Sequence, residues 1–347
     1  MMEKHANYLS CPKCNHSLKL KIFSKFSDNL HVKDGILNCV CGYQYPIING
    51  IPRLLVGALR NLIKKNHPGF FVKYSEHLRP ISIVNQDKIQ EKTALVHDSY
   101  IEPHPEFKKH VSGTELWLHP LKRDYFKNKV VLDAGCRIGT HMYHISSFKP
   151  KLVIGIDIGE SVETAFKINQ KNHNVLVIQA DLYTIPTSRI FDICYCFGVL
   201  HHLPNPEKGF QTLIEKIKLN GKLLFWVYGH DNYIDRQTIV FLRKLTLNLD
   251  MRMVRIISMI YASIYFLRIK LHNLQPKNQK KENSWFRYLD KFPFFAILQY
   301  IYDQFSPPIS HYYKKNDLEE WFECLSLKKI DMRNFQQGWK VLVDITN

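Results

Sequence analysis

The fold is decided by the stretch Lys129-Val-Val-Leu-Asp133-Ala-Gly-Cys-Arg-Ile-Gly139-Thr140. It opens with an apolar run of strand-forming residues that ends in an acid, continues through a turn of small residues, and leads into a helical pattern. Glycines let a nucleotide approach the backbone closely, and the first turn of a helix offers free N–H groups. The stretch therefore predicts a strand, a glycine loop and a helix, which alone is a weak sign of nucleotide binding.

Two further apolar strands, at residues 152–157 and 175–181, end in acids as the first does. Asp133, Asp157 and Asp181 follow one another at equal steps along the chain. A carboxylate in the second position suits a ribose diol, and one in the third can accept from an adenine amino group. Three strand-end acids around a glycine loop therefore favour a bound nucleoside.

The remaining strands complete a sheet. Residues 191–203 indicate a fourth strand that opens into a loop, and residues 222–228 a fifth. The end of the chain predicts a helix at 315–324 and a strand hairpin at 327–334 and 339–345. Strands that alternate with helices at this spacing favour a right-handed, mainly parallel sheet.

Residues 111–228 and the end of the chain resemble the class I S-adenosylmethionine-dependent methyltransferases. The likeness implies a Rossmann-like α/β sheet of seven strands, the last one antiparallel. It implies that the first loop wraps the methionine end of S-adenosylmethionine and that Asp157 binds both ribose hydroxyls. The cofactor-binding residues that it implies are Asp133, Ala134, Gly135, Cys136, Gly139, Asp157, Ile158, Asp181, Leu182, Phe197, Gly198 and Val199.

The glycine loop departs from the family pattern at two positions. Arg137 stands where the family has its middle glycine, and His141 stands where a further glycine is usual. The Arg137 side chain has three open roles: it reaches the methionine carboxylate, it points to solvent, or it marks a weakened cofactor pocket.

Four of the eight cysteines lie near the start of the chain, as Cys11-Pro-Lys-Cys14 and Cys39-Val-Cys41. Two such pairs can present four thiolates to one tetrahedral zinc ion, whose binding would stabilise a segment too small for a large core of its own. The second pair is CxC, so three alternatives stay open: Cys41 ligates from a tighter turn, His16 or His31 completes the site, or the site has decayed.

Residues 45–55 read as strand, turn and strand, and with the cysteine pairs they carry a second resemblance. Residues 8–58 are similar to a small zinc-ribbon-like family whose stand-alone members bind and activate methyltransferases that act on tRNA, rRNA and release factors. A fused copy implies a methyltransferase downstream on the same chain.

These observations predict five segments. They are a zinc-ribbon-like domain at 1–60, a helical linker at 61–110, an S-adenosylmethionine-binding domain at 111–228, a helical aromatic and basic insertion at 229–310, and a C-terminal helix and strand hairpin at 311–347.

The insertion follows the fifth strand, where class I sheets place the cofactor's methyl group, so we expect it to form the acceptor pocket or lid. Within it, residues 251–270 form an apolar helix with a polar stripe at Arg252, Arg255 and Ser258. Such a helix either packs on the insertion's own core or contacts a membrane surface.

The amino-acid composition indicates which broad class of protein this chain belongs to. Apolar residues at 45% and charged residues at 23% exclude disordered and collagen-like chains, and the few clustered cysteines do not suggest a disulfide scaffold. The first residues carry early charges, and the longest apolar run, 256–267, is too short to span a bilayer, so we expect a cytoplasmic protein without a transmembrane span. The net charge of +17 is concentrated in 1–60 and 229–300, where an anionic partner can bind.

Three functions remain open. The first is methyl transfer to an oxygen or nitrogen atom of a small or lipophilic metabolite, favoured by the aromatic insertion. The second is methylation of rRNA or tRNA, favoured by the zinc ribbon and the basic segments. The third is a non-catalytic binding protein of the same fold. If the acceptor must lose a proton, His202 and His311 are the predicted catalytic bases.

Overall fold

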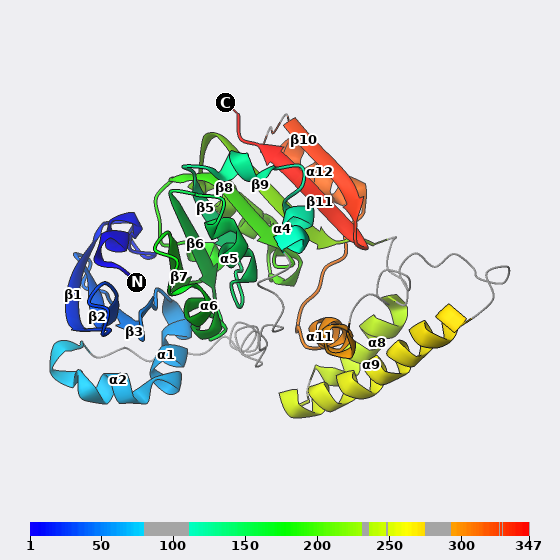
Figure 1. Cartoon of the computed structure of the whole chain (residues 1–347), viewed down its shortest axis with the longest axis horizontal. Helices are drawn as coiled ribbons and strands as arrows, with labels where there is room; N and C mark the ends of the chain where they lie inside the picture. The colour runs from blue at the N-terminus through cyan, green and yellow to red at the C-terminus, as the bar shows by residue number, and fades with distance from the viewer. Residues whose placement is uncertain are drawn as a thin grey trace. The chain divides into compact units, whose positions relative to one another are not determined.

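The computed structural model describes residues 1–79, 111–230, 236–247, 249–274, 293–325, 327 and 329–346 (Figure 1). Contacts between residues divide the chain into two units: a main unit, Met1–Asn232 with Ile309–Asn347, and a helical unit, Tyr233–Pro308. Parts of the predicted linker (80–110) and of the predicted insertion (231–235, 248 and 275–292) lie outside the described residues.

A seven-stranded sheet in the order β10-β11-β9-β8-β5-β6-β7 forms the centre of the main unit. Its strands are β5 (Val130–Ala134), β6 (Leu152–Asp157), β7 (Val175–Gln179), β8 (Phe191–Phe197), β9 (Ile217–Tyr228), β10 (Lys329–Phe335) and β11 (Gly338–Asp344). Strands β5 to β9 pair in parallel, whereas β11 runs antiparallel to both β9 and β10. The predicted α/β sheet of seven strands, of which the last strand in the chain is antiparallel, is therefore confirmed. β9 begins earlier than the predicted fifth strand, because Ile217 already pairs with Phe191 ahead of a local irregularity.

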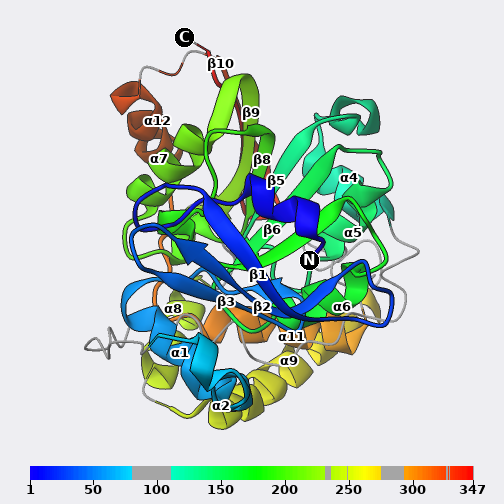
Figure 2. The same ribbon diagram turned by 90° about the vertical axis from the view of Figure 1, so that its left-hand side faces the viewer.

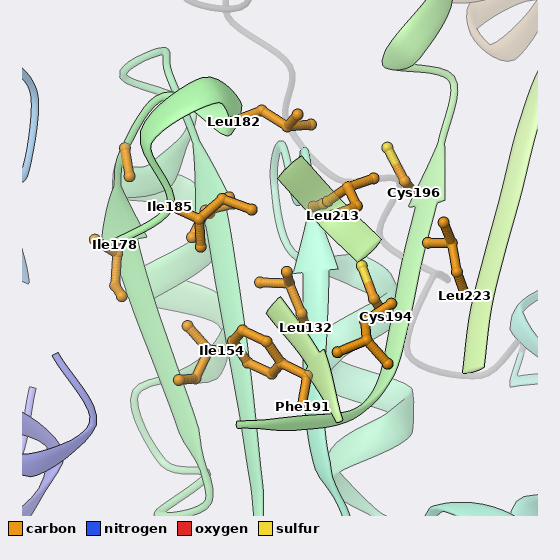
Figure 3. Packing of buried hydrophobic residues seen from close by; sticks show 14 of the residues in the cluster. Leu132, Ile154, Ile178, Leu182, Ile185, Phe191, Cys194, Cys196, Leu213 and Leu223 are labelled. Atoms are coloured by element: carbon orange, nitrogen blue, oxygen red, sulfur yellow. The ribbon is translucent and has the colours of Figure 1, made fainter. Parts of the chain in front are cut away.

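Helices cover both faces of this sheet, which is why its parallel strands are apolar almost throughout. Val131 and Val153 belong to the core cluster that α4, α5 and α6 share, whereas Leu132 and Ile154 belong to the cluster shared by α7 and α12. Figure 3 shows part of the second cluster, in which side chains such as Leu132 and Ile154 project from the strands toward Leu213 of α7. The helices are α4 (Val111–Leu118), α5 (Thr140–Ser146), α6 (Val162–Asn169), α7 (Pro206–Lys216) and α12 (Lys315–Cys324).

The N-terminal module is a second, four-stranded antiparallel sheet in the order β1-β2-β3-β4. Its elements are the 3-10 helix η1 (Glu3–Tyr8) and the strands β1 (Leu18–Lys25), β2 (Val32–Cys39), β3 (Gln44–Ile48) and β4 (Ile51–Pro52). Asn49 and Gly50 form the tight turn between β3 and β4, both with positive φ, as a two-residue hairpin requires.

The N-terminal module packs along the edge of the seven-stranded sheet at β7 (Figure 1), and Figure 2 shows it from the side of its strands β1, β2 and β3. Arg53, just after β4, bridges Gln179 of β7 in parallel, and the N–H of Leu54 donates to the Gln179 carbonyl at 2.8 Å. The N–H of Ser10 donates to the carbonyl of Pro186 at 2.9 Å. One core cluster contains buried residues of both sheets. The module therefore covers a strand edge that would otherwise be open to pairing.

Short helices connect these parts of the main unit. They are η2 (Gly57–Leu59), α1 (Arg60–Asn66), α2 (Pro68–Lys73), η3 (Ser75–His77), η5 (Arg123–Phe126), η6 (Leu182–Thr184) and η7 (Leu200–His202).

The helical unit contains α8 (Arg236–Thr246), α9 (Met251–Leu274) and α11 (Phe294–Phe305). It has an apolar cluster of its own, in which Val254 and Ile269 of α9 pack with Ile297 and Phe305 of α11. The buried Arg243 side chain links α8 to α11 by donating from Nε to the Gln304 carbonyl at 2.8 Å. Among the described helices, none combines the length and apolar character that a bilayer crossing needs.

Candidate cofactor site

Two glycines shape the loop after β5, and the loop closes over the end of β6. Gly135 has a φ of +86° and Gly139 a φ of +76°, in the left-handed region that favours glycine. The N–H groups of Gly135 and Cys136 both donate to the carbonyl of Ile156, at 2.8 and 2.9 Å. The loop is thus held against the neighbouring strand at the carboxyl edge of the sheet, where ligands bind in open α/β folds.

Arg137 occupies the family's glycine position and adopts a glycine-like backbone, with a φ of +49°. Its N–H donates to Oδ2 of Asp157 at 2.9 Å, and the N–H of Gly159 donates to Oδ1 at 3.0 Å. The substitution therefore leaves the conformation of the loop in place. Each carboxylate oxygen can accept more than one hydrogen bond, so Asp157 is fixed in position and can still accept from a diol.

Asp133 lies at the end of β5 and is buried. Burial raises the pKa of Asp133 to about 8, although a hydrogen bond from the Tyr195 hydroxyl, 2.8 Å from Oδ2, lowers it. Asp133 therefore bonds β8 through Tyr195, and its raised pKa favours the protonated carboxyl near neutral pH.

Asp181 follows β7 and caps the 3-10 turn η6, because its Oδ1 accepts from the N–H of Tyr183 at 3.0 Å. Burial raises the pKa of Asp181. Leu182 beside it is buried, and Ile158, after β6, is partly buried against the N-terminal module. The structure thus brings the three predicted acids, with Leu182 and Ile158, to one edge of the sheet.

The loop after β8 lies next to the glycine loop. The side chain of Val199 packs against Gly135, where a Cβ atom would collide with it. Phe197 stacks on Tyr195 with 5.4 Å between ring centroids. Gly198 has a φ of +77°, and a Cβ atom there would meet no atom within 4 Å. The glycine loop, Gly198 and the carboxylates of Asp157 and Asp181 thus lie at the same edge of the sheet.

An aromatic cluster beside this loop was missed by sequence reasoning. Trp117 of α4 lies with its ring centroid 5.2 Å from Phe197 and 5.4 Å from Trp226. His141 also contacts Phe197, its Nδ1 is 3.1 Å from the Thr114 hydroxyl, and burial lowers the pKa of His141 to about 4. A single Trp in a short helix gives no periodic pattern in the sequence. The only sign of this aromatic cluster in the sequence was His141, which stands where a glycine is usual.

The predicted base His202 is one end of a defined histidine pair. The N–H of Tyr228 donates to His201 Nδ1 at 3.3 Å, so the neutral ring of His201 carries its hydrogen on Nε2. That Nε2 is 3.1 Å from His202 Nε2, and His202 Nδ1 is 2.9 Å from the Ile309 carbonyl, which can only accept. Both ring nitrogens of His202 therefore have protein partners.

The second predicted base, His311, lies in the segment that returns beside the end of β9. Its N–H donates to the His201 carbonyl at 2.8 Å, and its Nε2 is 3.2 Å from the Leu203 carbonyl. Nε2 must carry a hydrogen to make that bond, which leaves Nδ1 with the lone pair. The structure thus places His202 and His311 in adjacent segments, and only His311 keeps a ring nitrogen that can accept a proton.

The four N-terminal cysteines converge. The Sγ atoms of Cys11, Cys14, Cys39 and Cys41 all lie within 4.8 Å of one another. Thiolates on a tetrahedral zinc ion, at Zn–S distances of about 2.3 Å, are about 3.8 Å apart. The Cys11 and Cys41 sulfurs are 3.8 Å apart, and the Cys14 and Cys39 sulfurs 3.3 Å. The cluster can therefore hold zinc with Cys41 as a ligand from the tighter turn.

The surroundings of the cysteine cluster shift the pKa values of two of its thiols in opposite directions. The backbone N–H of Tyr43 lowers the pKa of Cys41 to about 6, whereas burial raises the pKa of Cys39 to about 12. His16 and His31 are not among the cysteine cluster's four side chains; His31 Nδ1 instead pairs with Asp28 Oδ2 at 2.6 Å.

An ion-pair network around Arg53 was also missed. The guanidinium of Arg53, fully buried, donates to Glu160 Oε2 and to Gln179 Oε1, both at 3.0 Å, and pairs with Glu163. His67 Nε2 is 3.0 Å from the same Glu160 oxygen. The positive charge among these acids is supplied by Arg53, so the group is an ion-pair network. A cation inside the apolar run 51–55 was the signal in the sequence.

Comparisons with known proteins agree with this geometry. The family model described as "Methyltransferase domain" matches residues 132–225. The tRNA U34 carboxymethyltransferase of Helicobacter pylori strain P12 is 25% identical over 168 residues, which are 44% of this chain and 64% of that protein. The enzyme of the same name from Shewanella sp. strain ANA-3 is 28% identical over 102 residues, 28% of this chain and 31% of that protein. The chain thus spans less than two thirds of the length of these curated relatives.

Solved structures include the complex between the Haloferax volcanii Trm112 methyltransferase activator and a methyltransferase, at 10% identity and a TM-score of 0.42 over 76% of this chain and 100% of that one. They also include magnesium protoporphyrin IX methyltransferase from Synechocystis PCC 6803, at 13% identity and a TM-score of 0.38 over 82% of this chain and 97% of that one. On its family match, its strand order and its glycine loop, this chain carries a class I S-adenosylmethionine-dependent methyltransferase domain.

Proposed function

We propose that this chain transfers the methyl group of S-adenosylmethionine to an oxygen or nitrogen atom of a small or lipophilic acceptor. Bound S-adenosylmethionine would supply an electrophilic methyl group. Asp157 would accept from both ribose hydroxyls, Asp181 from the adenine amino group, and the loop at Gly135 would hold the methionine end. Because methyl transfer is an in-line displacement, the protein contributes mainly by holding the acceptor close and aligned.

The choice of a small acceptor rests on the residues at the carboxyl ends of β8 and β9. Residues 198–203, 228–230 and 309–313 are aromatic, histidine, aliphatic or small, and none is Lys or Arg. Tyr228 stacks on both His201 and Tyr312, with ring centroids 3.7 and 5.6 Å apart. An RNA acceptor needs cations along its phosphates, whereas a flat or apolar small molecule packs on aromatic rings.

In this proposal His311 is the base, and His202 positions it. His311 Nδ1 holds a lone pair that can accept a proton from an acceptor hydroxyl or amine. His202 donates to the carbonyl of Ile309, two residues before His311, and so fixes the returning segment. The role of residues 229–310 as an acceptor lid stays a prediction.

Cofactor binding is tested by calorimetric titration with S-adenosylmethionine. Wild-type protein should bind, and Asp157→Ala should weaken binding by about tenfold to hundredfold, because charged hydrogen bonds to the ribose are lost. Glu215→Ala, which removes an exposed acid from α7, is the matched control and should bind normally. Absence of binding in folded wild-type protein would favour the non-catalytic alternative.

The acceptor is tested with methyl-labelled S-adenosylmethionine and two fractions of a cell extract, the organic-soluble metabolites and the total RNA. Label should enter the metabolite fraction. His311→Gln should retain cofactor binding and lose most transfer, if the acceptor is deprotonated in the reaction. Label that enters only RNA would replace this proposal.

A tRNA acceptor is the second candidate function. The curated relatives are named tRNA U34 carboxymethyltransferases, and the net charge of +17 suits an anionic partner. Label recovered in purified tRNA, and absent from a random-sequence RNA of equal length, would select this candidate.

We also propose that the cysteine cluster binds one structural zinc ion. Metal analysis of protein purified without chelator should find about one zinc per chain. Cys14→Ser should lower this content, and Cys324→Ser, in α12, should leave it unchanged. A folded wild-type protein with almost no zinc would show that the site has decayed.

A further inference from the structure

Helix α9 has a buried side and an exposed side, and both are apolar. Val254, Ala262, Tyr265 and Ile269 are buried and pack in the cluster shared with α11. The buried Ser258 hydroxyl, on the same side, donates to the Val254 carbonyl at 2.8 Å. The core of the helical unit therefore uses only one stripe of α9.

The opposite side carries a continuous stripe that we call the apolar ridge. Its residues recur at steps of three and four, so they align along one face over about 27 Å. Each is between 46 and 58% exposed. The ridge consists of Met253, Ile256, Ile260, Ile264, Leu267 and Leu271. Large exposed apolar patches of this kind mark sites of interaction.

Cations border the apolar ridge on both sides. At 100° per residue, Arg252 and Lys270 fall along one side of the ridge and Arg268 along the other, whereas Arg255 lies farther round the helix, nearer its buried side. All four side chains are exposed, and α9 contains no Asp or Glu. The face therefore combines a convex apolar centre with positive edges.

We propose that the apolar ridge of α9 lies on an anionic lipid surface, with the helix in the plane of the interface. Apolar side chains of a helix enter the boundary between headgroups and acyl chains, while flanking Arg and Lys contact the phosphates. Charge complementarity selects this occupant: an anionic bilayer matches both positive edges at once. A second copy of the chain would instead set two cation-bordered ridges against each other. The proposal does not depend on the methyl-transfer reaction.

The test is co-sedimentation of the full chain with vesicles of pure phosphatidylcholine and with vesicles that also contain phosphatidylglycerol. We expect binding to the anionic vesicles and little to the neutral ones. Ile260→Ser with Ile264→Ser keeps the net charge and should weaken binding by at least about tenfold, because two half-buried apolar contacts with the lipid are lost. Arg252→Gln with Arg268→Gln should weaken it by about tenfold or more through lost attraction to phosphates.

The matched control is Val72→Ser with Leu219→Ser, which removes two exposed apolar side chains from the main unit, 77 and 50% exposed. It should bind like wild type, and far-ultraviolet circular dichroism should show that every variant keeps its helices. If Ile260→Ser with Ile264→Ser binds anionic vesicles as well as wild type does, the binding depends on charge alone and the proposal is overturned. Absence of binding of the wild-type protein to anionic vesicles would also overturn it. A third contrary result is a dimer, detected by light scattering, that does not bind vesicles and that Ile260→Ser with Ile264→Ser dissociates.

Discussion

Gly135 meets two constraints at once. Its φ of +86° lies in the left-handed region, and a Cβ atom would collide with the side chain of Val199. We predict that Gly135→Ala lowers the free energy of unfolding by about 1–2 kcal/mol for the backbone conformation and by about 1–3 kcal/mol for overpacking. Urea denaturation measures the sum.

A second glycine separates the two contributions. Gly57 also has a positive φ, +59°, but a Cβ atom there would meet nothing within 4 Å, so Gly57→Ala should lose only the backbone share. Adding Val199→Ala to Gly135→Ala should recover part of the loss by making room. Equal losses at the two glycines would show that the contact with Val199 is unimportant.

The buried carboxyl of Asp133 predicts a pH dependence. Burial raises its pKa from 3.8 to about 8, so the folded state holds the proton more tightly than the unfolded chain. Between these pKa values, stability therefore falls as pH rises, by at most about 1.4 kcal/mol per pH unit. Asp133→Asn removes this titration and can keep the bond from Tyr195.

The measurement compares urea unfolding of wild type and Asp133→Asn at several pH values between 5 and 8. The difference in unfolding free energy should shift in favour of the variant as pH rises. Other titrating groups, such as His141, are common to both proteins and cancel in the difference. Parallel pH profiles would contradict a raised pKa at Asp133.

At the scale of elements, the buried guanidinium of Arg53 joins β4 to β7, and its partners lie near the loop that holds Asp157. Burial would raise the pKa of Glu160, but the hydrogen bond from His67 and the charge of Arg53 outweigh it and lower that pKa to about 2. Glu160 lies three residues after Asp157, and Gln179 bonds both Arg53 and the carbonyl of Ile158. The N-terminal module thus helps to position the loop that holds Asp157.

We predict that Arg53→Met costs about 3–5 kcal/mol of stability, because it leaves buried acids without their cation. The same change should weaken S-adenosylmethionine binding by about threefold to thirtyfold through the shifted loop. Arg60→Met is the matched control: Arg60 of α1 bonds the Gln44 carbonyl of β3 at 3.1 Å, so its loss should spare cofactor binding. Equal affinity of wild type and Arg53→Met for S-adenosylmethionine would show that the N-terminal module does not help to position the cofactor-binding loop.

The sequence predicted those features that repeat along the chain, and missed those that join distant segments. Apolar strands ending in Asp133, Asp157 and Asp181 reveal the sheet, because each strand obeys the same local rule. The partners of Arg53 and His202 obey no such rule: Arg53 and Glu160 are 107 residues apart, as are His202 and Ile309. Only the folded chain shows these bonds.

At the scale of the whole molecule, the net charge of +17 does not coincide with the proposed acceptor edge. The residues after β8 and β9, and those of the returning segment 309–313, contribute no Lys or Arg. The cations of α9 lie instead in the helical unit, along the apolar ridge. The acceptor edge, as these residues define it, therefore offers no cation to the phosphates of an RNA, although the chain as a whole is strongly basic.

We therefore predict that tRNA binds this protein as a nonspecific polyanion. Its affinity should fall by about a thousandfold or more between about 50 and 200 mM salt, as counterion release requires for many phosphate contacts. A random-sequence RNA of the same length should bind equally well, and neither RNA should alter a calorimetric titration with S-adenosylmethionine at the higher salt. Tight binding at 200 mM salt that is confined to tRNA would show a dedicated RNA surface, because nonspecific attraction to phosphates cannot tell one folded RNA from another.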